Sequence, residues 1–126
     1  MRNKIISVIN QKGGVGKTTT VINLAAGLSL LEKKILVIDL DPQGNATTGL
    51  GLSNTISSDQ TIYGVLNGTC NISSVIKKTN YKNLDLVPSN VDLSGLEVET
   101  AGDGRRAFIL KDQIMAYLNN SGASYD

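Results

Sequence analysis

The 126-residue sequence contains no histidine and only one cysteine, Cys70. Without histidine, the chain can build neither a histidine-based catalytic triad nor a histidine-ligated zinc site. A single cysteine excludes an internal disulfide and any cysteine-cluster metal site, which fits a protein of the reducing cytosol. Acid–base chemistry must therefore fall to carboxylates, lysine, tyrosine or water.

The sequence also lacks an excess of one charge and a long apolar run. Its formal net charge of +1 gives no whole-chain argument for nucleic acid or membrane binding. The apolar run that follows Arg2 and Lys4 stops at Asn10, which is too short for a signal peptide. No segment approaches the roughly 20 apolar residues that a membrane span needs. We expect a single cytoplasmic domain with no membrane partner.

Three short apolar runs predict β-strands, at Ile5–Ile9, Ile35–Ile38 and Leu84–Val87. Between the first two, from about Lys17 to Leu31, apolar residues recur with helical spacing. The expected apolar face of this helix consists of Val21, Leu24, Ala25, Leu28 and Leu31. Strand, helix and strand at this spacing predict a right-handed βαβ unit with parallel strands, and hence an α/β fold.

The rest of the chain is less regular. Residues 42–60 are rich in Gly, Ser, Thr and Asn, which predicts a long functional or mobile loop. Short helices are expected at Ile62–Leu66 and Ile72–Lys77, so that Lys77 and Lys78 would lie on a solvated helix face, as would Arg105 and Arg106. A longer helix from about Arg105 to Leu118 would bury Leu110, Ile114 and Leu118.

The segment QKGGVGKTTT, residues 11–20, lies between the first predicted strand and the helix. It nearly matches the phosphate-binding pattern G-x-x-x-x-G-K-[ST], except that Gln11 takes the place of the first glycine. Glycines let backbone amides approach phosphate oxygens, and the helix N-terminus adds a partial positive charge. Lys17 would bridge the β- and γ-phosphates, and the Thr18 hydroxyl would be a ligand of Mg²⁺. The alternative is an ordinary glycine turn, which the strand–loop–helix context disfavours.

A second lysine, Lys12, stands five residues before Lys17. A lysine at the edge of a loop is by default a solvated side chain. The pattern K-G-G-x-G-K-[ST], however, resembles the deviant phosphate-loop ATPases, the family of ParA/Soj partition proteins, MinD and nitrogenase iron protein. The resemblance implies that Lys12 reaches across a nucleotide-sandwiched dimer and neutralises charge that develops on the partner's phosphates. The expected ATP-binding residues are Lys12, Gly13, Gly14, Val15, Gly16, Lys17, Thr18 and Thr19.

The segment VIDLDPQGNATTGLG, residues 37–51, resembles the ParA/Soj version of the family. The resemblance implies that Asp41 positions or activates the attacking water and that Asp39 lies just outside the direct ligands of the metal. A carboxylate at the end of a parallel strand beside a phosphate loop is well placed for both roles. The catalytic pair would then be Lys12 and Asp41. Two alternatives stay open: in the first, Asp41 serves only to start a turn before Pro42, and in the second, the run ILVID, which has the form of a Walker B strand, is that strand.

The resemblance extends over the whole chain. The stretches VPSNVDLSGLEVE, residues 87–99, and GRRAFILKDQI, residues 104–114, look like the family's middle segment. The resemblance places the start of the family's Walker B strand, of the form Y-D-x-I-I-I-D-x-P-P, at Tyr125. Residues 1–126 are therefore expected to be the N-terminal half of a ParA-type P-loop (SIMIBI-like) ATPase domain, a parallel sheet flanked by helices and truncated before that strand. The first strand would lack a neighbour, and this half alone is expected to be inactive.

The function implied by the resemblance is Mg²⁺-dependent ATP hydrolysis in chromosome or plasmid partition. ATP would promote a homodimer that binds DNA without sequence preference, through residues mostly beyond residue 126. A ParB-type centromere-binding protein would stimulate hydrolysis, and the protein would be cytoplasmic and associated with a bacterial nucleoid. Two alternatives are a non-catalytic remnant with weak or no nucleotide binding, and a MinD-like, membrane-associated positioning ATPase.

Overall fold

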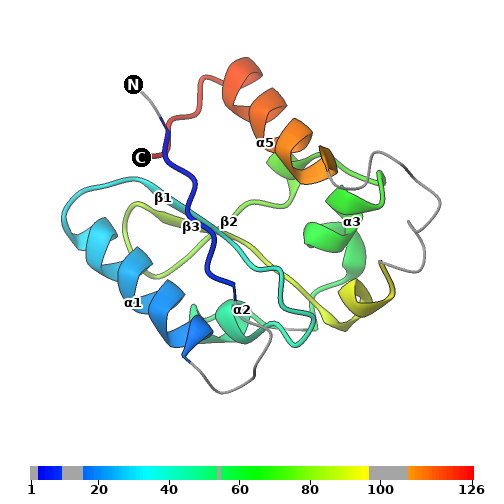
Figure 1. Ribbon diagram of the computed structural model, residues 1–126, viewed down its shortest axis with the longest axis horizontal. Coiled ribbons are helices and arrows are strands. Elements are labelled where there is room, and N and C mark those ends of the chain that lie inside the picture. Colours follow the sequence, from blue (N-terminus) through cyan, green and yellow to red (C-terminus); the bar gives the residue numbers. More distant parts are fainter. Residues whose placement is uncertain (1–2, 10–15, 54, 97–107) are drawn as a thin grey trace.

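The computed structural model describes residues 3–9, 16–53, 55–96 and 108–126. A three-stranded sheet in the order β1-β3-β2 lies at its centre (Figure 1). Strands β1, Ile35–Ile38, and β3, Leu84–Val87, are parallel, and β2, Lys77–Lys78, runs antiparallel to β3. The α-helices are α1 Lys17–Leu30, α2 Asn45–Gly49, α3 Ile62–Leu66 and α5 Ile109–Asn120. Short 3-10 helices span Ser58–Gln60, Ile72–Ser74 and Val91–Gly95.

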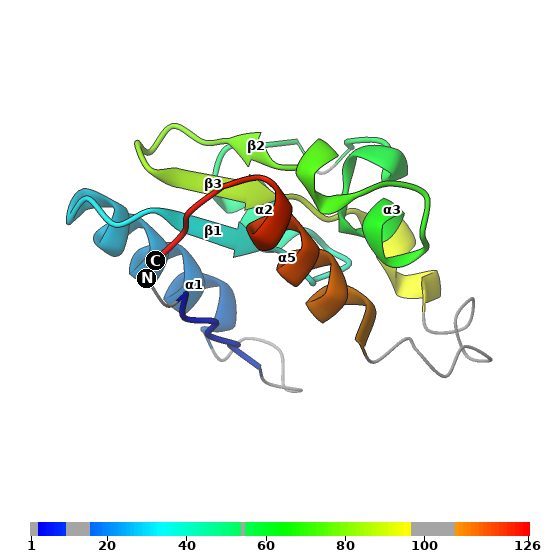
Figure 2. The ribbon, with the colours of Figure 1, turned by 90° about the horizontal axis from the view of Figure 1, so that it is seen from above.

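Helices cover both faces of the sheet, with α1 and α2 on one side and α3 and α5 on the other (Figures 1 and 2). Side chains alternate between the faces along each strand, as a pleated backbone requires. On the α1 side, Val37 packs with Leu84 and Leu86 in one buried cluster. On the α3 side, Val87 packs with Ile62 and with other buried residues of a second cluster. The two predicted strands Ile35–Ile38 and Leu84–Val87 are thus confirmed, and so is the α/β fold.

The first predicted strand is wrong, because residues 3–9 form no strand. Ile5, Ile6 and Ile9 are 69%, 66% and 83% exposed. An apolar run becomes a strand only where a neighbouring backbone pairs with it. In the described part of the chain, β1 pairs with β3 alone, and residues 3–9 lie apart from its other edge (Figure 2). The predicted βαβ unit therefore lacks its first strand here.

Two local predictions between residues 42 and 78 are also wrong. The expected loop contains α2 and the 3-10 helix Ser58–Gln60. The expected helix from Ile72 stops after one turn at Ser74, and Lys77 and Lys78 form β2. In this strand Lys78 lies opposite Asp85 of β3, and its ammonium Nζ lies 3.0 Å from an Asp85 carboxylate oxygen. Pairing with a neighbouring strand decides the structure here, and the apolar spacing within the segment does not show that pairing.

The two long helices bury part of their predicted apolar faces. On α1, Val21 and Ala25 pack against the sheet, but Leu24 is 42% exposed and Leu31 is 71% exposed. On α5, the predicted Leu110 and Ile114 pack against the second cluster, together with Tyr117. The helix begins at Ile109, and Arg105 and Arg106 lie outside the described residues.

Candidate functional site

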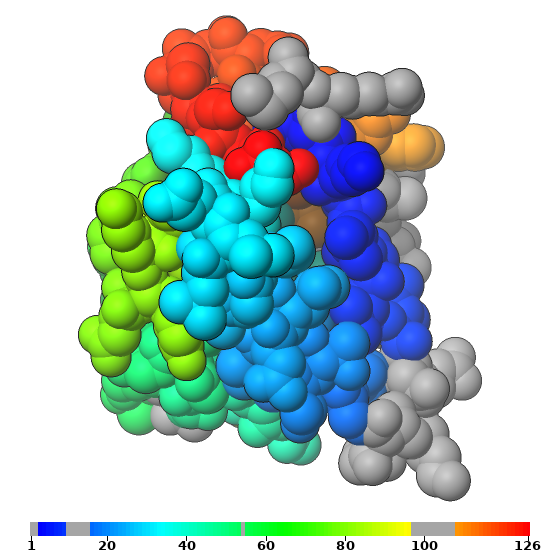
Figure 3. Space-filling view, turned by 90° about the vertical axis from the view of Figure 1, so that its left-hand side faces the viewer, coloured from blue at the N-terminus to red at the C-terminus, as the bar shows by residue number. Residues whose placement is uncertain are grey.

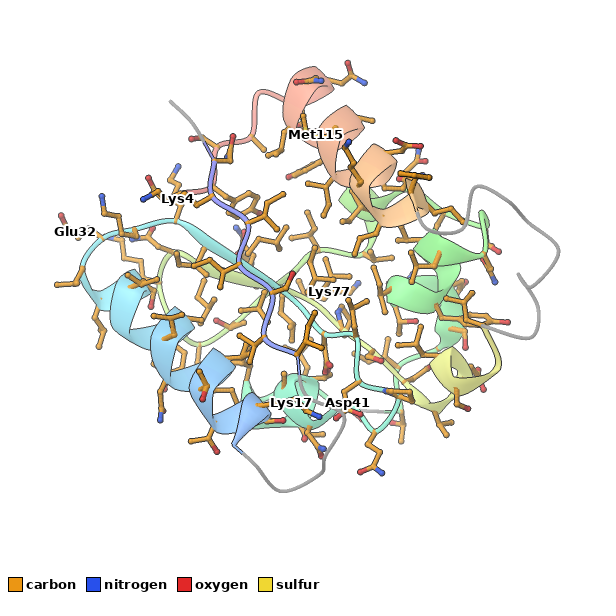
Figure 4. The ribbon with its side chains drawn as sticks, in the orientation of Figure 1. Lys4, Lys17, Glu32, Asp41, Lys77 and Met115 are labelled. Carbon is orange, nitrogen blue, oxygen red and sulfur yellow. The ribbon has the colours of Figure 1, made fainter. Side chains whose placement is uncertain are left out.

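The carboxyl ends of the two parallel strands and the start of α1 meet at one end of the sheet. Figure 4 shows Lys17, at the start of α1, beside Asp41 in the turn that follows β1. Beside this end of the sheet, α2 packs against α1. Their packing is close at Gly49, where an added Cβ would lie 2.3 Å from Ile22 Cδ1. In α/β sheets this end is where ligands bind.

The described part of the glycine loop begins at Gly16. Its backbone is left-handed, with φ of 92°, a conformation that favours glycine. The Gly16 carbonyl accepts a hydrogen bond of 2.9 Å from the Thr20 amide, so α1 starts at once with Lys17. Lys17 and Thr18 are half-buried in the first turn. The predicted residues Lys12, Gly13, Gly14 and Val15 lie outside the described residues.

Asp39 is buried at the end of β1, and hydrogen bonds reach both of its carboxylate oxygens. Oδ2 accepts from the Thr47 amide at 2.8 Å and from the Thr47 hydroxyl at 2.6 Å. Oδ1 accepts from the Asp41 amide at 2.9 Å. A buried charge is tolerated when such donors replace water. Asp39 therefore fastens the turn after β1 to α2, and its place near a metal stays a prediction.

Asp41 is half-buried in the turn between β1 and α2. Its Oδ1 accepts from the Gln43 amide at 3.0 Å, and its Oδ2 accepts from the Asn45 side-chain amide at 2.9 Å. The turn closes with a 2.8 Å bond from the Gly44 amide to the Asp41 carbonyl, and Gly44 is left-handed with φ of 67°. Asp41 thus does start a turn, as one alternative predicted. Each carboxylate oxygen has a second lone pair for water or a ligand, so the catalytic role stays a prediction.

Two buried hydroxyl residues, Thr47 and Ser89, organise this end of the sheet and were missed from the sequence. The Ser89 hydroxyl donates to the Asp41 carbonyl at 2.7 Å, and the Ser89 amide donates to the Thr47 hydroxyl oxygen at 3.0 Å. Both side chains are fully buried. They join the end of β3 to the turn after β1 and so fix Asp41 relative to the sheet. The signal in the sequence that could have identified Ser89 is its position directly after the buried strand and Pro88.

The arrangement suits an anionic ligand with a bound cation. The first turn of α1 carries the partial positive charge of a helix N-terminus, to which the Lys17 side chain adds a full one. The Thr18 hydroxyl in the same turn is a suitable oxygen ligand for Mg²⁺. Within the described ranges, no group of three or more His, Cys, Asp or Glu side chains could hold a metal ion.

The comparisons with known proteins agree with this geometry. The AAA domain family matches residues 3–126. The chromosome partitioning protein ParA of Caulobacter vibrioides is 42% identical over 122 residues, which are 97% of this chain and 45% of that protein. The chain therefore spans about half the length of the curated relatives it matches. No helix within the described residues is both long and apolar enough to cross a membrane.

Two solved structures share the fold. The cobyrinic acid a,c-diamide synthase from Mycobacterium smegmatis, with bound ATP analog and magnesium, has a TM-score of 0.81 and 35% identity, over 90% of this chain and 45% of that one. A plasmid partition protein from Borrelia burgdorferi has a TM-score of 0.77 and 30% identity, over 99% of this chain and 54% of that one. These likenesses confirm the predicted phosphate-loop α/β fold and the similarity to ParA-type proteins.

Proposed function

The chain belongs to the AAA domain family, and on that basis we propose that it is the nucleotide-binding part of a Mg²⁺-dependent ATPase of ParA/Soj type, acting in chromosome or plasmid partition. The observation that carries the proposal is the placement of Lys17, at the N-terminus of α1, beside Asp41 (Figure 4). A phosphate-binding group and a carboxylate of catalytic type share one end of the sheet.

We assign the nucleotide phosphates to the loop and the first turn of α1, that is, to residues 12–19. Lys17 supplies the direct charge partner of the phosphates, and the Thr18 hydroxyl holds Mg²⁺. Mg²⁺, when bound, neutralises charge that develops on the transferred phosphoryl group. The choice of ATP and Mg²⁺ is supported by the Mycobacterium smegmatis synthase, which was solved with an ATP analog and magnesium.

Asp41 orients the attacking water in this proposal, because its carboxylate is fixed by the turn and yet half-exposed. Asp39 acts through the turn, since it holds the Asp41 amide and both donors of Thr47. Lys12 serves the phosphates of the partner subunit in an ATP-dependent homodimer.

The wider assignments follow from the ParA-type relatives. We propose that residues 1–126 correspond to the N-terminal half of the ATPase domain. The complete protein would bind DNA without sequence preference, respond to a ParB-type centromere-binding protein, and work in the cytoplasm at the nucleoid. Support comes from the 42% identity to a chromosome partitioning protein.

The test is a chimera in which residues 1–126 replace the matching part of the Caulobacter vibrioides protein. Lys17→Ala should abolish nucleotide binding, because the phosphates lose their direct charge partner. Lys12→Ala should spare most of the binding while it removes hydrolysis. Lys33→Ala, an exposed lysine beyond the other end of α1, is the control and should change neither. Equal loss of ATP affinity in the Lys12 and Lys17 variants would contradict the role of Lys12 across the dimer. A chimera that neither binds nor hydrolyses ATP would favour the alternative of a non-catalytic remnant.

A further inference from the structure

The carboxylate of Asp41 is held by two donors of different kinds. Its Oδ1 accepts from the backbone amide of Gln43 at 3.0 Å, a donor that any residue except proline would supply at that position. Its Oδ2 accepts from the side-chain amide of Asn45 at 2.9 Å. An ionised carboxylate can only accept, so the amide nitrogen of Asn45, and not its oxygen, must face Asp41. The second bond therefore depends on the identity of residue 45.

The backbone of Asn45 is fixed before its side chain reaches Asp41. Asn45 is the first residue of α2, directly after the buried, left-handed Gly44. Two residues further along the helix, the Thr47 amide and hydroxyl both donate to Asp39. Helix α2 also packs against α1, and Figure 3 shows the surface around α2 directly beside that of α1. The Asn45 side chain therefore starts from a rigid point of the fold.

Two donors on different oxygens fix the plane of a carboxylate. The torsion about the Cβ–Cγ bond of an aspartate has broad preferences, so a single hydrogen bond leaves the plane free to turn. With the Gln43 amide on Oδ1 and the Asn45 amide on Oδ2, the Asp41 carboxylate has one orientation, and each oxygen keeps a second lone pair. Such orientation raises the rate of a reaction in which the group must meet a water molecule at a set angle.

Asn45 supplies its donor without adding a charge. A lysine at this position would form an ion pair with Asp41 and weaken it as a proton acceptor. An aspartate would offer no donor and would add a second negative charge. The neutral amide of Asn45 does neither. Its side chain is exposed and makes no other hydrogen bond to the described residues, so its contact with Asp41 is the one that a substitution would remove.

We propose that Asn45 is a positioning residue for ATP hydrolysis, whose side-chain amide holds the Asp41 carboxylate at the angle at which Asp41 orients the attacking water. The inference rests on the proposed function and adds to it a residue that acts without contact to the nucleotide. Because Asn45 acts through Asp41, its loss should lower the rate of hydrolysis and spare the binding of ATP.

The experiment uses the chimera in which residues 1–126 replace the matching part of the Caulobacter vibrioides protein. Asn45→Ala removes the donor, and Asn45→Asp keeps the shape of the side chain but, when ionised, can only accept. The helix dipole favours an aspartate in the first turn, so Asn45→Asp should keep α2 folded. Thr48→Val, in the same helix, is the control. Phosphate release gives kcat and KM for each chimera, equilibrium binding gives its affinity for ATP, and a thermal melt checks its fold.

Asn45→Ala and Asn45→Asp should each lower kcat at least about tenfold, because a carboxylate that is free to turn meets the water in the wrong orientation. KM and the affinity for ATP should stay within about twofold of the natural values, and Thr48→Val should change none of the three. An unchanged kcat in Asn45→Ala would overturn the inference and leave the proposed function intact.

Two other outcomes would also overturn the inference. If the ATP affinity or the melting temperature of both Asn45 variants falls together with kcat, Asn45 is a structural residue and not a positioning one. If the chimera of natural sequence neither binds nor hydrolyses ATP, the proposed function fails, and this inference fails with it.

Discussion

Replacing Thr47 by valine should destabilise the chain strongly, although the two side chains have similar shapes. The Thr47 hydroxyl donates to the buried Asp39 carboxylate at 2.6 Å and accepts from the Ser89 amide at 3.0 Å. The first bond goes to a charged acceptor, and such bonds contribute roughly 1.5–3 kcal/mol. The variant also leaves the Ser89 amide buried without an acceptor, which costs about 1–3 kcal/mol. Because the two losses share one hydroxyl, we expect a total of about 3 kcal/mol.

The assay is urea unfolding of the 126-residue chain followed by circular dichroism. For a denaturant slope of about 2 kcal/mol per M, the midpoint should fall by roughly 1.5 M. The control is Thr48→Val at the next position, because the exposed Thr48 hydroxyl makes only long bonds of 3.3 Å to Gly44 and Asn45 carbonyls. That variant should shift the midpoint little. Equal shifts for Thr47→Val and Thr48→Val would refute the assignment of Thr47 and Ser89 as the residues that hold this end of the sheet.

Three further outcomes are expected. Gly64→Ala should destabilise the chain by roughly 2 kcal/mol, because the added Cβ would lie 3.0 Å from the Ser58 carbonyl oxygen. On α1, a Cβ added at Gly27 would meet no neighbouring atom, so Gly27→Ala should stabilise the chain by up to about 1 kcal/mol. Thermal melts compare the two variants. Burial and the bond to Asp85 raise the pKa of Tyr125 above its ordinary value of 10.0, so the stability that Tyr125 adds is present below pH 10.0 and is lost as pH rises through the higher pKa. Alkaline melts should therefore show a steeper loss for the natural chain than for Tyr125→Phe. The chain alone should release no phosphate from Mg-ATP above background, and turnover that disappears in Asp41→Ala would contradict this.

The sequence correctly predicted the strands and helices that other elements of the fold cover. Strand Leu84–Val87 is buried throughout and strand Ile35–Ile38 is half-buried, so their apolar runs were sufficient signals. The helix that begins at Lys17 was predictable because the motif and the helical spacing agree. Ile5–Ile9 also carries an apolar run, but no strand in the described part of the chain pairs with it, as the resemblance implied when it left this segment without a neighbour.

The candidate site was predictable in its residue types and not in its internal bonds. Asp39 and Asp41 follow a strand, which the sequence shows. Their fixation depends on Ser89, which comes 48 residues after Asp41 and meets it only because β1 and β3 are neighbours. The pairing of Lys78 with Asp85 likewise depends on strand register. Contacts between distant segments of this kind leave no local pattern in the sequence.

The central claim is that the first turn of α1 binds nucleotide phosphates through Lys17. The most direct measurement is equilibrium binding of a fluorescent ATP analogue to the 126-residue chain, with and without Mg²⁺, for the natural sequence, Lys17→Ala and Lys33→Ala. We predict loose but saturable binding that Mg²⁺ strengthens, that Lys33→Ala preserves, and that Lys17→Ala weakens at least about tenfold. Equal affinity in the natural chain and in Lys17→Ala would contradict the account.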